Sequence, residues 1–193
     1  MKRITVFCGS SGGNQASYRL QAAALGRTLA EQHIELVYGG SKVGLMGAVA
    51  DGVLGAGGKV IGVLPRFLKT KELAHEELTE LLLVDSMHER KTKMSELCDG
   101  VIALPGGFGT LDELFEMLTW GQLGIHKKPV ALLNMDGFYD PLLAMVRTMV
   151  EKGFLKEADR KMVLISAEAE DLLDKMRRYV APTGGKWIGK DTL

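Results

Sequence analysis

Residues 101–118 read VIALPGGFGTLDELFEML and contain the pattern that decides the fold. The apolar, β-branched run at 101–104 predicts a buried strand. Apolar residues at three- and four-residue spacing from 111 to 123 predict an amphipathic helix. The glycine-rich segment between them is a strand-to-helix turn. This strand, turn and helix form a repeating unit of parallel α/β sheets.

The same alternation extends in both directions along the chain. Further apolar runs predict strands at 4–8, 35–38, 59–64, 81–84, 130–133 and 163–165. Amphipathic segments predict helices at 15–31, 45–54, 87–97, 141–152 and 169–180. This order favours an α/β fold, a Rossmann-like doubly wound parallel sheet with helices on both faces. We expect a single domain over residues 1–181 and a frayed C-terminal tail at 182–193, where the periodicity is lost.

Composition argues against several classes of function. The 193 residues include 24 Lys plus Arg and 24 Asp plus Glu, so a net charge of zero offers no attraction to nucleic acid or an anionic membrane. No stretch approaches the roughly 18 apolar residues of a membrane span, and the first residues lack the apolar core of a signal peptide. Cys8 and Cys98 lie in apolar segments and are expected to be reduced core residues. We therefore expect a cytoplasmic protein.

The strand-to-helix turns are the places to look for chemistry, because doubly wound sheets bind ligands beyond the carboxyl ends of their strands. The turn after the second strand reads YGGSKVGLMG and offers Gly40, Ser41 and Gly44 as a phosphate cradle at a helix start. A tight turn with close helix-to-sheet packing is the alternative. A nicotinamide cofactor is disfavoured, because dinucleotide enzymes end the second strand with an acid and this strand ends in Tyr38 and Gly39.

The turn after the fifth strand is a second candidate cradle. Gly106, Gly107 and Gly109 let backbone N–H groups approach a phosphate. Thr110 is placed to cap the following helix and to hydrogen-bond a phosphate or ribose oxygen. Two glycine cradles in one small domain are difficult to explain by packing alone. We therefore predict phosphate binding at this turn.

Glu113 and Glu116 follow this cradle on one face of the predicted helix. Glu113 also fits a capping box with Thr110, in which its carboxylate only satisfies the helix start, and the spacing does not choose between the two roles. Two stacked carboxylates repel each other, so the pair makes sense where a cation forms. An oxocarbenium-like ribosyl transition state is such a cation, and a carboxylate can also orient or deprotonate the attacking water.

A basic cluster follows the fourth strand. Ser86 and Glu89 fit a capping box, so Glu89 is predicted to be structural. Arg90, Lys91 and Lys93 then crowd the first two helical turns, where the helix dipole disfavours cations. A solvated basic face is one explanation and an anion site is the other. We favour an anion site for Arg90, because its turn lies beside the glycine cradles.

The remaining reactive side chains form no recognisable site. The four histidines show no metal-ligand spacing with one another or with the cysteines. Ser10 and Ser11 lie in a glycine-rich turn but lack the Gly-x-Ser-x-Gly nucleophile elbow. We therefore predict no metal, no covalent nucleophile and no cofactor.

The motifs together resemble those of the Lonely Guy family, the cytokinin-activating phosphoribohydrolases. PGGFGTLDE at 105–113 matches the family signature PGGxGTxxE. Segments similar to its other blocks follow in order: GGS at 39–41, GLMG at 44–47, LPRFL at 64–68 and SMHERK at 86–91. The resemblance covers residues 4–180. PGGxGT alone is shared with a wider superfamily, which includes molybdenum-cofactor carriers.

The resemblance implies a reaction and roles for particular residues. The reaction is hydrolysis of the N-glycosidic bond of AMP or an N6-prenylated AMP, which releases the base and ribose 5-phosphate. Arg90 and Glu113 fall on the family's catalytic arginine and glutamate, so Glu113 is expected to act in catalysis as well as at the helix start. The expected substrate-binding residues are Gly40, Ser41, Gly44, Met87, Lys91, Gly106, Gly107, Gly109, Thr110 and Glu116.

Three other classes of function fit the sequence less well. The label lysine decarboxylase, often given to such proteins, fits less well, because no pyridoxal-phosphate lysine context is distinct and phosphate cradles suit a nucleotide. A non-catalytic nucleotide or molybdenum-cofactor carrier is the competing class, and release of free base from AMP separates the two. Single-stranded nucleic-acid binding is disfavoured by the neutral charge and the few aromatic residues. The pocket that would select between AMP and prenylated AMP is built from apolar residues, which look like core residues in the sequence.

The helix after the signature carries more apolar surface than one sheet face covers. Its apolar residues are Leu111, Leu114, Phe115, Met117, Leu118, Trp120, Leu123 and Ile125. A sandwiched helix within the monomer is one explanation. Helices of doubly wound folds lie in outer layers, however, so a partner subunit is the expected cover. We therefore expect a homodimer at least, and the resemblance implies active sites that include residues from both subunits.

Overall fold

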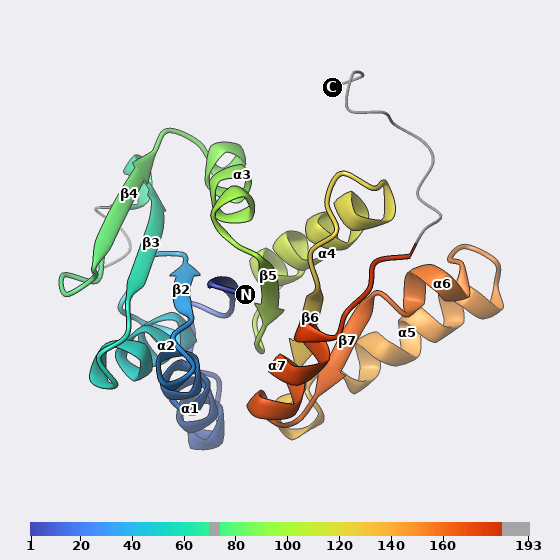
Figure 1. Ribbon diagram of the computed structural model, residues 1–193, viewed down its shortest axis with the longest axis horizontal. Coiled ribbons are helices and arrows are strands. Elements are labelled where there is room, and N and C mark those ends of the chain that lie inside the picture. The colour runs from blue at the N-terminus through green and yellow to red at the C-terminus, as the bar shows by residue number, and fades with distance from the viewer. Residues whose placement is uncertain (70–73, 183–193) are drawn as a thin grey trace.

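The computed structural model describes residues 1–69 and 74–182 and contains a seven-stranded sheet (Figure 1). The strands are β1 (Arg3–Phe7), β2 (Glu35–Tyr38), β3 (Val60–Pro65), β4 (Glu80–Val84), β5 (Gly100–Ala103), β6 (Val130–Leu133) and β7 (Val163–Ser166). All neighbours run parallel in the order β4-β3-β2-β1-β5-β6-β7. The predicted doubly wound parallel sheet is confirmed, and the direction of winding reverses between β1 and β5.

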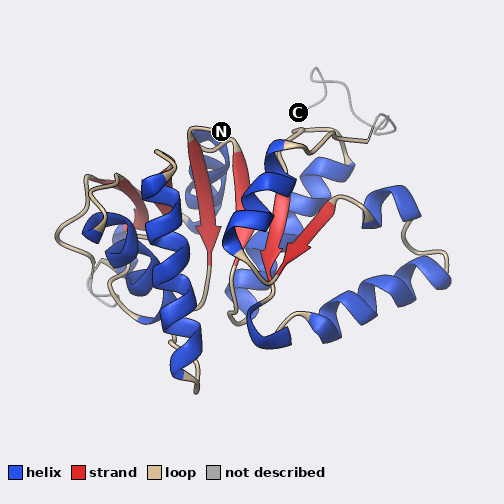
Figure 2. Ribbon diagram, turned by 60° about the horizontal axis from the view of Figure 1, so that its bottom comes forward, coloured by secondary structure: helices blue, strands red, loops and turns tan. Residues whose placement is uncertain are grey.

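Helices cover both faces of the sheet (Figure 2). They are α1 (Ala16–Glu31), α2 (Gly44–Gly55), α3 (Met87–Leu97), α4 (Phe108–Gln122), α5 (Asp140–Glu151), α6 (Glu157–Arg160) and α7 (Ala169–Arg177). Apolar residues of α1, α2 and α7 form one core with the sheet, and those of α3, α4 and α5 form the other. Within the described ranges, no helix is both long and apolar enough to cross a membrane.

Helix boundaries differ from prediction at a few places. The short helix α6 and the 3-10 turns η1 (Arg66–Leu68) and η2 (Met135–Gly137) were not predicted, because so few residues show no periodicity. Helix α4 starts before the predicted residue 111, because Gly109 has low helix propensity and the sequence pattern hides the first turn. The tail predicted at 182–193 lies, from residue 183 onward, outside the described residues.

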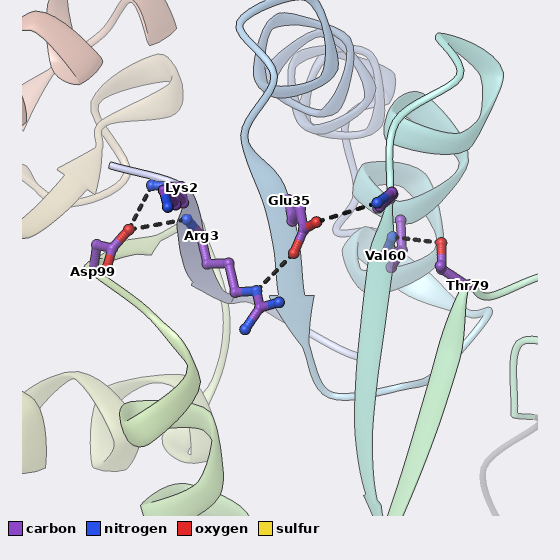
Figure 3. A network of polar contacts seen from close by, with 7 residues as sticks. Lys2, Arg3, Glu35, Val60, Thr79 and Asp99 are labelled. Atoms are coloured by element: carbon purple, nitrogen blue, oxygen red, sulfur yellow. Dashed lines mark hydrogen bonds and ion pairs between the residues drawn. The ribbon is translucent and has the colours of Figure 1, made fainter.

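A polar network joins the amino ends of β1, β2, β3 and β5 (Figure 3). The carboxylate of Asp99 accepts hydrogen bonds from the backbone N–H groups of Lys2 and Arg3. The Nε of Arg3 donates to Oε2 of Glu35 at 2.6 Å, and Nζ of Lys59 lies 3.7 Å from the other oxygen of Glu35. These contacts align β1 with its neighbours at the amino edge of the sheet and leave the carboxyl edge for ligands.

Candidate active site

A cavity of about 300 Å³ opens at the carboxyl ends of β1 and β2, beside the start of α4. It lies next to the reversal between β1 and β5, where doubly wound sheets bind ligands. The cavity is lined by Val6, Phe7, Cys8, Gly9, Ser10, Gly39, Met46, Met87, Arg90, Met94, Gly107, Phe108, Gly109, Thr110, Asp112 and Glu113. The fold therefore brings the helices that follow β4 and β5 together at one cavity.

The amino end of α4 forms one wall of this cavity. Gly107 occupies the N-cap position and has no side chain that could accept a hydrogen bond from the helix. The first N–H groups of α4 therefore have no hydrogen-bond partner inside the helix. A Cβ on Gly107 or Gly109 would meet no atom within 4 Å, so both glycines face open space. A Cβ on Gly106 would instead lie 2.1 Å from Oγ1 of Thr110. The free N–H groups and the helix dipole make this wall suited to an anion.

Thr110 does not have the capping role predicted for it. It lies inside the first turn of α4 and is buried, while Gly107 takes the N-cap position. The capping box between Thr110 and Glu113 is therefore wrong, because both residues lie beyond the helix start. This geometry removes the helix-capping explanation for Glu113.

Glu113 is a buried carboxyl group in the cavity wall, with 8% of its surface exposed. Burial raises its pKa to about 7, although the cation of Arg90 acts in the opposite direction. A carboxyl group with this pKa changes its protonation near neutral pH. Such a group is suited to acid–base chemistry or to charge stabilisation.

Arg90 meets Glu113 from α3 and is also buried, with 7% of its surface exposed. Its Nη1 lies 3.9 Å from Oε1 of Glu113 and 3.8 Å from Sδ of Met87. Its Nε is buried and has no hydrogen-bond partner among the described residues. Unmet donors on a buried cation are costly, so these donors are suited to a polar or anionic ligand. This arrangement agrees with the anion site predicted for Arg90.

The start of α3 holds Arg90 in this position. The Oγ of Ser86 accepts a hydrogen bond from the N–H of Glu89 at 3.1 Å. The carboxylate of Glu89 accepts one from the N–H of Asp85 at 2.7 Å. The structural role predicted for Glu89 is confirmed, with the N–H of Asp85 in place of that of Ser86 as the second donor.

Lys91 and Glu116 pair with each other where α3 faces α4. The Nζ of Lys91 lies 3.1 Å from Oε1 of Glu116 and 3.2 Å from Oδ2 of Asp112. Glu116 is thus paired with a lysine, and it is not among the residues that line the cavity beside Glu113. These ion pairs tie together the two helices that carry Arg90 and Glu113.

The turn after β2 has a packing role. Gly40 and Gly44 have φ values of +83° and +65°, and a Cβ on Gly44 would lie 2.2 Å from the carbonyl oxygen of Ser10. Ser41 is fully buried. The N–H of Leu45, in the first turn of α2, donates to a backbone carbonyl of the turn after β1 at 3.1 Å. This N–H group is therefore already paired. These contacts show the tight turn and close packing given as the alternative, and phosphate binding by Gly40, Ser41 and Gly44 stays a prediction.

Several cavity residues were not assigned to the site by sequence. Gly39, Met46 and Phe108 lie inside the motifs, so their position there was an available signal. Cys8 and Met94 resemble core residues, and nothing in the sequence distinguishes them. Burial raises the pKa of the Cys8 thiol far above its usual value, which keeps it protonated. Across residues 1–69 and 74–182, no group of three or more His, Cys, Asp or Glu side chains is placed to hold a metal ion.

Known proteins are similar to this sequence over most of its length. A family model described as "Possible lysine decarboxylase" matches residues 46–176. The rice (Oryza sativa subsp. japonica) "Probable cytokinin riboside 5'-monophosphate phosphoribohydrolase LOGL5" is 51% identical over 94% of this chain and 74% of its own. The Arabidopsis thaliana "Cytokinin riboside 5'-monophosphate phosphoribohydrolase LOG1" is 47% identical over 93% of this chain and 84% of its own. The chain belongs to the Lonely Guy family.

Solved structures of more distant proteins have the same fold as this Lonely Guy chain. A molybdenum-cofactor-binding protein from Rippkaea orientalis is 24% identical, with a TM-score of 0.70 over 92% of this chain and 96% of that one. The molybdenum-cofactor carrier protein of Chlamydomonas reinhardtii is 21% identical, with a TM-score of 0.66 over 91% and 96%. At these identities the likeness establishes the fold alone, and membership of the Lonely Guy family rests on the closer plant relatives.

Proposed function

We propose that this protein hydrolyses the N-glycosidic bond of AMP or an N6-substituted AMP and releases an adenine-type base and ribose 5-phosphate. The observation that carries the proposal is the burial of Glu113 beside Arg90 in a cavity walled by the open amino end of α4. Relatives named as cytokinin riboside 5′-monophosphate phosphoribohydrolases support it.

The 5′-phosphate binds at the amino end of α4. The first N–H groups of this helix lack partners within it, and Gly107 and Gly109 present no side chain that would block their approach. The phosphate is remote from the bond that breaks. Its binding energy therefore positions the anomeric carbon near Glu113 and does not take part in the bond changes.

The reacting bond joins C1′ of the ribose to a nitrogen of the base. As this bond breaks, its electron pair goes to the base and positive charge develops on the ribose. The ionised carboxylate of Glu113 stabilises that charge and orients water, whose oxygen forms the new bond to C1′ and whose proton is transferred toward the base. Arg90 binds and polarises the nucleotide, and burial strengthens both electrostatic interactions. Water is the co-reactant, so the proposed reaction uses no cofactor.

A second copy of the chain covers the outer face of α4 in this proposal. Phe108 is 94% exposed at the helix start, and a surface groove on the same helix is lined in part by half-buried apolar side chains. The groove is lined by Phe108, Leu111, Asp112, Phe115, Glu116, Thr119 and Trp120. An exposed apolar face of this kind marks an interaction site. Phe108 also lines the cavity, so the dimer would bring each active site next to its partner.

Release of free base from purified protein tests the proposed function. We expect adenine or isopentenyladenine to appear from AMP and isopentenyladenosine monophosphate, and the ratio of the two rates measures the preference for the N6 substituent. Adenosine, which lacks the phosphate, should have a much lower kcat/KM because α4 then contributes nothing to positioning. Binding of AMP without release of base would instead identify a carrier, and equal rates for adenosine and AMP would refute the phosphate assignment.

A further inference from the structure

The guanidinium of Arg90 is held by long contacts. Its Nη1 lies 3.8 Å from the sulfur of Met87 and 3.9 Å from the carboxylate of Glu113. Its Nε has no hydrogen-bond partner among the described residues. The contact with Glu113 is longer than an N–H···O hydrogen bond, and the thioether sulfur of Met87 is only a weak acceptor, so neither orients the arginine as a normal charged hydrogen bond would. The orientation of Arg90 must therefore depend on the shape of the space around it.

Gly39 supplies part of that space at the end of β2. A Cβ built on Gly39 would lie 2.2 Å from Nη2 and 3.4 Å from Cζ of Arg90. It would also lie 2.8 Å from Sδ of Met46. The arginine head group thus occupies the volume that any side chain at position 39 would take.

Neighbouring glycines of the same segment have a different reason to be glycine. Gly40 and Gly44 have positive φ values, which other residues rarely adopt. A Cβ on Gly47 would lie 2.0 Å from the backbone oxygen of Lys42, which cannot move without the turn. Gly39 has neither constraint: its φ is not positive, and the close atoms belong to the ends of two flexible side chains.

We propose that Gly39 is a positioning residue for Arg90, and that its missing side chain creates the slot in which the guanidinium is aligned with Glu113 and the substrate. An alanine at this position is compatible with the backbone but displaces the arginine head group. The inference rests on the proposed function, because it assigns the role of Gly39 to the nucleotide-cleaving site. Gly39 would then shape the site through its missing side chain, without contributing a charge or a hydrogen bond.

A double-mutant cycle tests the proposal on the full-length protein. The variants are Gly39→Ala, Arg90→Ala and the two combined, each assayed for kcat/KM with AMP, for AMP affinity and for melting temperature. Gly55→Ala is the matched control, because a Cβ at this helix position meets no atom within 4 Å. Comparison of the wild type with Arg90→Ala tests the proposed function without any change at Gly39. A failure of the proposed function can therefore be distinguished from a failure of the role of Gly39.

Gly39→Ala should lower kcat/KM about a hundredfold in the wild-type background, the effect expected when a catalytic group is misplaced by about 1 Å. In the Arg90→Ala background it should change kcat/KM and AMP affinity by less than about twofold, because the displaced group is gone. Most of its cost in melting temperature should disappear there as well, because only the contact with the flexible Met46 side chain remains. Equal losses of stability in both backgrounds, or wild-type turnover by Gly39→Ala, would refute the positioning role. Gly55→Ala should match the wild type.

Discussion

The Nη1 atom of Arg90 lies 3.9 Å from Oε1 of Glu113, and both side chains are about nine-tenths buried. This separation is longer than a hydrogen bond, so the charges attract each other while their donors and lone pairs remain available. Burial of such a pair does not in itself stabilise a fold, because desolvation offsets the attraction. The arrangement is therefore best explained by a ligand that enters between or beside the two groups.

Glu113→Gln should retain the fold and AMP binding but lose turnover by about two orders of magnitude or more, the scale of removing a positioned acid–base or charge-stabilising group. The amide keeps the shape of the side chain and cannot carry the charge. Base release measured by chromatography checks the rate, and calorimetry checks AMP affinity. Glu96→Gln is the control, because this glutamate is exposed on α3. Near-normal turnover by Glu113→Gln would leave Glu113 with a structural role only.

The rate should depend on pH through Glu113. Its pKa is about 7, and the proposed mechanism uses the ionised carboxylate, so kcat/KM should rise with pH and level off above about pH 7. In Glu113→Gln the residual activity should lack this transition. A wild-type rate that falls as pH rises through this range would show instead that the protonated acid is the active form.

The same pKa predicts a trend in stability. Because the pKa of Glu113 is raised from 4.5 to about 7 by burial, the folded protein holds its proton where the unfolded chain has lost it. The contribution of Glu113 to stability is therefore full below about pH 4.5 and is lost as the pH rises to about 7, by about 1.4 kcal/mol for each pKa unit. Denaturant unfolding across this range should show the free energy of unfolding of Glu113→Gln increasing with pH relative to that of the wild type. A constant difference between the two proteins would contradict the raised pKa.

Arg90→Ala should impair cleavage about a hundredfold or more, because a buried cation that polarises the nucleotide is removed. The loss of this cation should also raise the pKa of Glu113 further, so the pH midpoint of the residual rate should move upward. Lys93→Ala is the control on the same helix, where the side chain is exposed and pairs loosely with Glu96. Normal kinetics with a lowered melting temperature would identify Arg90 as a structural residue.

Light scattering at micromolar concentration should give at least the mass of a dimer. Phe115→Arg, in the apolar groove of α4, should shift the protein toward the monomer and reduce its activity. Phe154→Arg is the matched control, because this residue is 86% exposed outside the groove. Circular dichroism establishes that both variants are folded. A fully active wild-type monomer would exclude both the interface and a site shared between subunits.

The strands were predictable because buried parallel strands are short, β-branched apolar runs bounded by turn residues, and their length separates them from helices. The start of α4 was not predictable from the sequence. Its position depends on Gly107 as N-cap, and glycines look the same in a turn and at a helix start. The capping box that Thr110 and Glu113 also fitted is absent for this reason, while Ser86 does cap its helix, because this serine begins the periodic segment.

The site was predictable in its chemical groups and less so in their roles. The motif placed Glu113 and Arg90 correctly at one cavity. It also offered Gly40 and Gly44 as ligands to phosphate, and the structure shows that these glycines in addition supply positive φ angles and close packing. A glycine can serve backbone geometry, helix packing or a neighbouring side chain, as Gly39 does, and the three uses are indistinguishable until the chain is folded.

Phe108 belongs to two surfaces at once, the cavity that we propose binds nucleotide and the groove that we propose binds a second subunit. A side chain common to two binding surfaces couples them thermodynamically when both binding events favour the same position of that side chain. If the nucleotide tightens dimerisation by some factor, dimerisation must tighten nucleotide binding by the same factor. Dilution should then weaken the affinity for AMP, and saturating AMP should preserve the dimer at concentrations where the free protein dissociates.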